Sequence, residues 1–487
     1  MLTRDFPQFM PVLAPMGARS LKQTLKPLRQ ATLSQIETRL RPLLPTGCLD
    51  NNASKDHSRE RLLPLDRTFW CWLWQTLQCN TSCRDVMKQV AMLFALHGRS
   101  LHENSSAYCQ SRKLILPALL QRIYIHLAQA AFGWAPASTC LQGRRLKALD
   151  GSSTRLADTP ENQAAFPQPT SQNPGAGFPV IKIVALFCVA GGAILAHATG
   201  NLWMSEISLA AQLINSLVAG DVLIVDRGFC NYALAAWLGR NKVDVIARVP
   251  TTIRHIDFRK GKRLASKDAL FVWNKSKVPC KWMALEQWLG LPETLTVRIL
   301  QVRIHSPGTR VKTLTLMTTL LDPVLYPARE IAQAYRLRWR EEMCFDDLKT
   351  TLHMAHLKCL APPMVKKELC MFLIAHNFLR CLMAQAAAQA QIKIEQISFK
   401  GTMDGFRQCS VAMTQAKSKA KRIAVWEEFM AGLAADILPD RPGRVEPRAV
   451  KRITKYPKLT TYRRLYKDRM SRNERRRQAT KRRHALI

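Results

Sequence analysis

The sequence predicts a mixed α/β protein, in which helical segments flank a central region built from both strands and helices. Three features support this. Residues 141–250 hold short, strongly apolar segments bounded by Gly, Pro and Asn. A long stretch around residue 340 contains no Gly or Pro, and residues 1–140 and 361–440 carry helix-like apolar patterns. With 487 residues, 47% of them hydrophobic, the chain can form two or three domains with substantial cores.

The charge balance indicates a polyanionic partner. The formal net charge is +38, which favours nucleic acid, with a membrane surface as the second alternative. The longest uncharged apolar run, 183–196, has 14 residues and includes Gly191-Gly192, so we expect no membrane span. The first residues lack the pattern of a signal peptide. The 14 Cys are scattered without a Cys-x-x-Cys pair, as expected for reduced thiols in the cytoplasm.

Residues 1–140 predict a helical N-terminal domain. The expected helices cover residues 68–77, 83–96 and 105–133, with Asn80-Thr81-Ser82 as caps before the second. The start of the third helix carries Tyr108, Gln110, Arg112 and Lys113, which would suit a DNA-reading module. An ordinary helical bundle with a polar rim is the alternative. We expect the alternating Trp70, Trp72 and Trp74 to lie in the core.

Residues 144–249 alternate between strand and helix patterns. The expected order is a short strand ending in Asp150, a hairpin of 180–189 and 193–198, a helix at 205–218, a buried strand ending in Asp226, a helix at 231–239 and a strand at 243–249. Followed by a long helix, this is the order of a ribonuclease-H-like domain. We place that domain at residues 141–360.

A second pattern interrupts this domain before its last helix. Residues 250–326 have alternating β character, so we expect a β-rich insertion there, containing Trp273, Trp282 and Trp288. Residues 361–440 predict a helical C-terminal region, with helices at 364–390 and 424–435 and a possible role in dimerisation. The tail, 441–487, holds 18 Lys/Arg against 3 Asp/Glu, so it is either a clamp on DNA phosphates or a solvated end.

The long helix of the central domain is expected to run from Pro327 to Leu360, because 329–361 contains neither Gly nor Pro. At about 100° per residue, five polar residues share one face: Tyr335, Arg338, Glu342, Asp346 and Lys349. Such a face is either a solvated surface with i,i+4 pairs or a carboxylate held among cations for phosphoryl chemistry. His353, His356 and Cys359 could be drawn as a zinc site, but a helix favours a structural role for them.

Three carboxylates lie on successive elements of the predicted ribonuclease-H-like domain. Asp150 and Asp226 end two strands that would be neighbours, at the sheet edge where ligands collect, and Glu342 follows on the helix. Such oxygen ligands suit Mg²⁺, with Mn²⁺ as a substitute. Two ions about 3.5–4 Å apart can activate an attacking oxygen and stabilise a leaving one in phosphodiester transfer.

These residues also carry a family resemblance. The pattern Tyr-x-x-Arg-x-x-x-Glu-x-x-x-x-x-x-Lys is met at Tyr335, Arg338, Glu342 and Lys349. With the segments Leu149-Asp150-Gly151-Ser152 and Val225-Asp226-Arg227-Gly228-Phe229 and the β insertion, the chain resembles the bacterial DDE transposases of the insertion-sequence-four family. The resemblance covers the chain from about residue 66 to the tail.

The resemblance implies cut-and-paste DNA transposition. Asp150, Asp226 and Glu342 would bind the metal ions, and water would nick the element's end to leave a 3′-hydroxyl for strand transfer. Arg338 and Lys349 would hold DNA phosphates, and Tyr335 would hydrogen-bond a phosphate near the terminal nucleotide.

The resemblance also implies partners and an intermediate. The partners would be double-stranded DNA, as inverted-repeat ends and target, and a second copy of the chain in a homodimeric synaptic complex. The compartment would be the bacterial cytoplasm, at the nucleoid. Relatives form a hairpin with a base flipped against a Trp of the insertion; Trp273 and Trp282 are candidates, with a structural role as the alternative.

Two other functions remain open at this point. A nuclease of the same fold would hydrolyse DNA without joining it, and would not need the Tyr/Arg/Lys face. A DNA-binding protein without catalysis would tolerate loss of an acidic residue or truncation, and neither is seen here. Inverted repeats beside the gene would favour the transposase.

Overall fold

The computed structural model describes residues 40–49, 63–95, 100–101, 103–134, 140–171, 175, 177–250, 256–303, 313–416 and 418–438. All of them belong to one compact unit of the chain. The predicted basic tail and the first 39 residues lie outside the described part.

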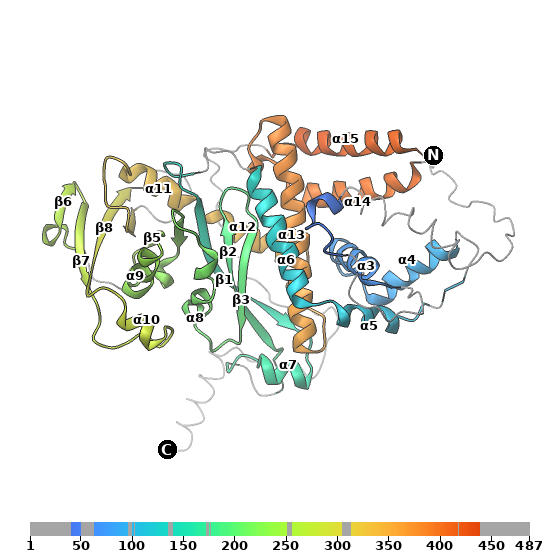
Figure 1. Ribbon diagram of the computed structural model, residues 1–487, viewed down its shortest axis with the longest axis horizontal. Helices are drawn as coiled ribbons and strands as arrows, with labels where there is room; N and C mark the ends of the chain where they lie inside the picture. The colour runs from blue at the N-terminus through green and yellow to red at the C-terminus, as the bar shows by residue number, and fades with distance from the viewer. Residues whose placement is uncertain are drawn as a thin grey trace, which may run out of the picture. The chain divides into compact units, whose positions relative to one another are not determined.

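The centre of this unit is one large mixed sheet, with the strand order β3-β2-β1-β4-β5-β9-β8-β7-β6 (Figure 1). Its first half consists of β1 (Leu146–Leu156), β2 (Val180–Cys188), β3 (Ile194–Gly200), β4 (Val222–Val225) and β5 (Asp244–Arg248). β1 to β3 are antiparallel neighbours, whereas β4 runs parallel to β1 and β5 parallel to β4. The predicted strands and hairpin of residues 144–249 are therefore present.

The predicted β-rich insertion is also present, but it extends the main sheet. It contributes β6 (Lys262–Ala265), β7 (Asp268–Asn274), β8 (Thr294–Arg303) and β9 (Thr313–Thr318), with the short helix α10 (Leu285–Leu289). β9 pairs antiparallel with β5. A buried ion pair, in which Arg298 donates to Asp268, lies inside the insertion, and Arg298 Nη1 also donates to the carbonyl of Tyr326 at 2.7 Å. The insertion is thereby fastened to the segment that leads into the next helix.

Helices cover both faces of the sheet. On one face, alternate residues of β1, β4 and β5 (Leu146, Ala148, Val222, Ile224 and Ile246) pack under α11 (Ala328–Arg336). On the other face, Leu149, Leu223, Val225 and Val245 pack against α8 (Glu206–Ala211) and α9 (Tyr232–Arg240). Ser205 caps α8 as predicted, although α8 ends earlier than residue 218.

The N-terminal region is helical, as predicted. It consists of α3 (Leu65–Leu77), α4 (Cys83–Ala95), α5 (Ser106–Leu114) and α6 (Pro117–Gly133). The single third helix expected at 105–133 is wrong: α5 and α6 meet at 76°, because Pro117 begins a new helix instead of continuing the old one. Trp70 and Trp72 are buried in the core, as expected, and Trp74 is partly exposed.

The C-terminal region consists of α13 (Pro362–Ala390), α14 (Phe399–Gln415) and α15 (Lys419–Ala435), and α13 packs along α6 (Figure 1). α14 lies between the two helices that the sequence predicts. Within the described residues, α13 is long and apolar enough to cross a membrane, contrary to the expectation that no segment could, and the bent pair α5 and α6 passes the same test only if it is counted as one span; 89% of the most apolar window of α13 is buried inside the protein.

The prediction of one helix over 327–360 is wrong. α11 ends at Arg336, where the amides of Leu337 and Arg338 turn to the carbonyls three residues before them. α12 (Trp339–Asp346) follows, then a π-helical turn, Asp347–Thr351, and the short strand β10 (His356–Leu357), which pairs with β1. Leu352, Met354 and Leu357 are buried, so core packing ends the helix in a segment without Gly or Pro.

Candidate active site

Asp150 and Asp226 occupy equivalent positions on two neighbouring parallel strands. Leu149 of β1 lies opposite Val225 of β4, and each aspartate is the next residue. Because side chains alternate along a strand, Asp150 lies on the same face as Ala148, and Asp226 on the face of Ile224. Both carboxylates therefore project beneath α11 from strands about 4.8 Å apart.

The sequence prediction placed Asp150 at the end of its strand, and this is wrong in detail. β1 continues to Leu156, paired with β2 and β10. The pairing of β1 with β4, however, stops at Leu149. Asp150 is thus the first residue of β1 that lies beyond the β4 ladder, and the opening between the strands begins there.

Arg338 connects the strand side of the site to the helix side. It is the residue before α12, and its Nη2 donates to Glu342 Oε1 at 2.9 Å. Its Nη1 lies 3.9 Å from Asp150 Oδ2. The i,i+4 pair that the sequence indicated is present, and the same guanidinium also faces a carboxylate that is 188 residues away in the chain.

The charges of Asp226 and Glu342 both act on the carboxylate of Asp150. Burial raises the pKa of Asp150; the amide of Gly151 and the charge of Arg338 oppose this rise, and the negative charges of Glu342 and Asp226 add to it. An acidic group whose ionised form is disfavoured by two neighbouring carboxylates is a group that a cation would stabilise.

Tyr335 lies at the base of the same cluster. It is 6% exposed, and burial raises its pKa, with smaller effects from Arg338, Asp226 and Arg248. The phenol thus stays neutral and keeps a proton that it can donate to an anionic oxygen. Five of the six predicted site residues therefore act on one another in one group: Asp150, Asp226, Tyr335, Arg338 and Glu342.

Lys349 is the exception in this group. It lies on the π-helical turn, and partial burial lowers its pKa. Within the described residues, no hydrogen bond or ion pair joins Lys349 to the three carboxylates. Asp346, which shares the predicted helix face, accepts a hydrogen bond from Thr350 at 2.7 Å, which is an ordinary contact within one turn.

Arg248 is a site residue that the sequence analysis missed. Ala247 of β5 lies opposite Val225, so Arg248 stands level with Asp226 on the next strand. It shares the face of Ile246, and its charge reaches Tyr335. The alternation of side chains along residues 244–248 could have shown which face of the sheet Arg248 lies on. Only the register of β5 against β4 places Arg248 beside Asp226.

Gly151 lies close to the start of α8 on the opposite face of the sheet. A Cβ atom at this position would lie 2.8 Å from the carboxyl carbon of Glu206, the first residue of α8.

The donor chemistry of the site fits a divalent cation, because it consists of carboxylate oxygens with an electrostatic need for positive charge. The side chains are not yet gathered for one: among the described residues, no three His, Cys, Asp or Glu side chains stand close enough together to hold a metal ion. Arg338 lies between Asp150 and Glu342 and supplies positive charge there. His353, His356 and Cys359 likewise form no such group in the described part of the chain.

The segment that carries the site is anchored to α13. Arg380 Nη2 donates to Asp347 Oδ2 at 2.7 Å, so an ion pair joins α13 to the π-helical turn just after α12. Burial raises the pKa of Asp347 to about 6, against the lowering effect of Arg380. The ion pair therefore fixes the position of the turn at some cost in desolvation.

Comparisons with known proteins identify the family. A model of the family described as "Transposase DDE domain" matches residues 141–378. The transposase InsG for insertion sequence element IS4, from Escherichia coli (strain K12), is 27% identical over 439 residues, covering 87% of this chain and 93% of that protein. Among solved structures, the piggyBac transposase synaptic complex with hairpin DNA aligns with 86% of this chain and 87% of its own, at 10% identity and a TM-score of 0.39. With the family match spanning both aspartates and Glu342, the chain is a DDE transposase of the insertion-sequence-four family, an enzyme that cleaves DNA and transfers strands.

Proposed function

We propose that Asp150, Asp226 and Glu342 are the catalytic carboxylates of a ribonuclease-H-like domain at residues 141–360, and that they cut the ends of an insertion sequence. The observation that carries the proposal is the register of β1 and β4, which sets Asp150 and Asp226 side by side under the helices that carry Glu342. The inverted ends of the element and its target would be double-stranded DNA.

The three carboxylates would hold Mg²⁺, for which Mn²⁺ could substitute. The bound ions supply activation of the attacking oxygen and charge neutralisation at the scissile phosphate. To admit them, Arg338 would release Asp150 and turn toward DNA. Arg338 and Arg248 then present guanidinium groups to phosphate oxygens, which they suit by shape and charge. Tyr335 donates its hydroxyl proton to a phosphate, and Lys349 adds a further phosphate contact.

The other regions would serve assembly and DNA binding. The helical region 1–140 would contact DNA, the β insertion at 250–326 would approach the cleaved end, and 361–440 would contribute to a homodimer that brings two ends together. The tail 441–487 would neutralise phosphates. This work would take place in the bacterial cytoplasm, at the nucleoid. Trp273 and Trp282 both pack partly against the core, which supports a structural role for each.

A cleavage assay tests the proposal. A supercoiled plasmid with the gene and a few hundred base pairs of native flank is incubated with purified protein and Mg²⁺, and strand breaks are mapped. We expect breaks at two inverted ends for the wild type, and a loss of at least about 10³-fold in rate for Glu342→Gln. Glu427→Gln, an exposed glutamate on α15, removes the same charge and should cleave as the wild type does.

Other outcomes would contradict the proposal. Scattered breaks by the wild type would indicate a nuclease that does not recognise ends. Full activity of Glu342→Gln would remove the third carboxylate from the mechanism while leaving the family assignment in place.

A further inference from the structure

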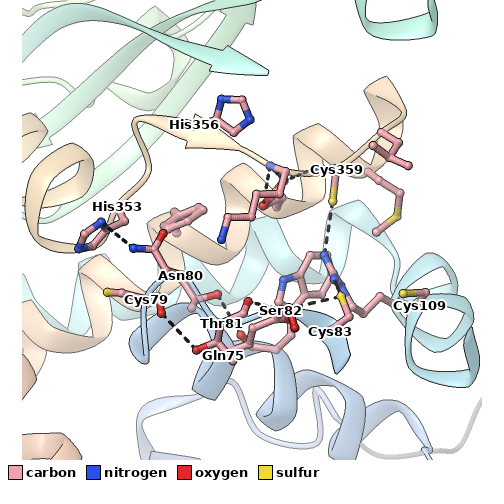
Figure 2. A pocket seen from close by; sticks show the side chains of 18 of the residues that line it. Gln75, Cys79, Asn80, Thr81, Ser82, Cys83, Cys109, His353, His356 and Cys359 are labelled. Atoms are coloured by element: carbon pink, nitrogen blue, oxygen red, sulfur yellow. Dashed lines mark hydrogen bonds between the residues drawn. The ribbon is translucent and has the colours of Figure 1, made fainter. Parts of the chain in front are cut away.

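A cavity of about 510 Å³ lies away from the carboxylates, between the N-terminal helices and the segment that follows the π-helical turn (Figure 2). Figure 2 shows Gln75 of α3, Thr81 and Ser82 of the following loop and Cys83 of α4 on one side. His353, His356 and Cys359 lie across the cavity from them. The lining is mainly apolar, and its size falls within the range that binds small organic ligands.

The wall of this cavity contains a buried cation. Arg112 of α5 is 6% exposed, and its guanidinium lies 4.0 Å from the ring centre of Trp72. Its Nη1 and Nη2 donate to the thiols of Cys83 at 2.9 Å and Cys359 at 3.4 Å. Its Nε, also buried, has no hydrogen-bond partner in the part of the chain that the structure describes.

Buried arginines are normally paired with a carboxylate, because an uncompensated charge is costly to desolvate. No described carboxylate forms an ion pair with Arg112. The acidic residue of the lining, Glu368, already accepts hydrogen bonds from the amides of Lys358 and Cys359, at 2.8–3.1 Å. Lys113 and Lys358, both exposed, also line the cavity. Its surroundings are therefore cationic, and thiols are weak acceptors that an anion would outcompete.

We propose that this cavity binds a nucleotide. A phosphate would meet Arg112 and Lys358, and a base would lie against the apolar wall formed by residues such as Leu352, Met364 and Phe372. An anion with a flat, largely apolar body satisfies both halves of the lining. Inorganic phosphate satisfies only the charged half, and an apolar ligand leaves Arg112 with the charge of Glu368, which is already bonded to two amides.

The nucleotide could be free or could belong to a DNA strand. β1 runs directly from Asp150 to the cavity wall, since Arg155 pairs with His356. Five residues of strand span about 17 Å, the rise of about five nucleotides of duplex. A strand cut at Asp150 could therefore reach the cavity. This DNA source rests on the proposed function, whereas binding of a free nucleotide does not.

Thiol protection gives a local readout. Full-length protein without divalent metal is treated with a maleimide, and labelling of Cys83 and Cys109, which line the cavity, is compared by mass spectrometry with Cys280, a partly exposed thiol in the insertion. The probes are deoxyadenosine 5′-monophosphate, deoxyadenosine, inorganic phosphate and a short single-stranded oligonucleotide. Affinities are measured in parallel by calorimetry.

We expect the mononucleotide or the oligonucleotide to slow labelling of Cys83 and Cys109 but not of Cys280. Lys358→Gln should weaken binding about 5- to 10-fold, as expected for loss of one charge-assisted contact. Lys366→Gln removes the same charge from an exposed position on α13 outside the lining and should bind like the wild type. Arg112→Lys keeps the positive charge but loses the planar set of guanidinium donors, so this variant should also bind more weakly.

The choice of probes distinguishes a free nucleotide from a nucleotide of a DNA strand. It also keeps a failure of the cavity proposal separate from a failure of the catalytic assignment. Protection by the mononucleotide supports a free ligand, and protection by the oligonucleotide alone supports a nucleotide of the DNA strand. Equal protection by inorganic phosphate, no protection by any probe, or binding that Lys358→Gln leaves unchanged would overturn the proposal. Because no cleavage is measured and no carboxylate of the active site is altered, none of these results bears on the catalytic assignment.

Discussion

At the residue scale, the site depends on a balance of charge around Asp150. This carboxylate is partly buried, two other carboxylates disfavour its ionised form, and Arg338 offsets them from 3.9 Å. The same guanidinium binds Glu342. Arg338 thus supplies positive charge between two carboxylates, which reduces the repulsion between them.

Arg248 gives a prediction at the same scale. It stands level with Asp226 on β5, so we expect Arg248→Gln to lose one phosphate contact beside the cleavage point. The slope of log binding constant against log salt concentration should become shallower by about 0.9. Filter binding or fluorescence anisotropy with end-containing DNA at several salt concentrations measures this slope.

The matched control for this variant is Arg263→Gln. Arg263 is exposed on β6, at the far edge of the sheet, and its replacement removes the same charge. If both variants changed the slope equally, the effect would report net charge and not the position of Arg248.

At the element scale, α13 is the support that holds the helical regions against the sheet. Asn377 accepts a hydrogen bond from the amide of Ile194 at 2.8 Å, and donates to the carbonyls of Ile194 at 2.9 Å and Tyr124 at 2.8 Å. A few residues further on, Arg380 holds Asp347 and packs against Gly192, where φ is +67° and a Cβ would lie 3.1 Å from the guanidinium carbon. One helix thus fixes β3, α6 and the π-helical turn.

Asn377→Ala should therefore be strongly destabilising. The change leaves the buried amide of Ile194 without its acceptor and removes a donor from the buried carbonyls of Ile194 and Tyr124, and an unsatisfied buried group costs about 1–3 kcal/mol. We expect the free energy of unfolding to fall by about 3 kcal/mol or more, measured by urea denaturation. Gln389→Ala, at an exposed position on the same helix, should change it by less than about 0.5 kcal/mol, and a similar effect of both variants would refute this account.

At the scale of the whole molecule, the buried contact between α13, α6 and β3 makes stability depend on pH. His376 of α13 is fully buried, with its ring 5.3 Å from that of Phe399, and burial, assisted by the charge of Arg380, lowers its pKa well below 6.5. Burial lowers the pKa of His197 on β3 to about 4. Both rings are neutral in the folded protein and protonated first in the unfolded chain.

We therefore expect the protein to lose stability in mild acid. As the pH falls below 6.5, His197 and His376 become protonated in the unfolded chain but stay neutral in the folded protein. The free energy of unfolding therefore falls by up to about 1.4 kcal/mol per pH unit for each histidine. Above about pH 7 this contribution is constant. Urea midpoints at pH 7.5, 6 and 5 measure the effect.

His376→Phe removes one of the two groups and should flatten the dependence. His126→Phe, at a partly exposed position on α6, should leave it unchanged. An unaltered slope in His376→Phe would show that other groups cause the acid sensitivity.

The sequence by itself predicted the family, the α/β class, the order of strands and the spacing of Tyr335, Arg338 and Glu342. These are local properties: apolar runs, caps and i,i+4 relations are visible along the chain because they arise between residues that are close in it. The prediction that Asp150, Asp226 and Glu342 act together as the catalytic group stays a prediction, supported by the register of the strands.

The tertiary structure decided what depends on residues far apart in the chain. A segment without Gly or Pro breaks after Arg336 and turns into β10, because buried Leu352, Met354 and Leu357 gain more from core packing than from further helix. The register of β5 places Arg248 beside Asp226, and the meeting of α5 with the segment before α13 creates a cavity around Arg112. Pairing and burial between distant segments set these features, and neither is encoded in any local pattern.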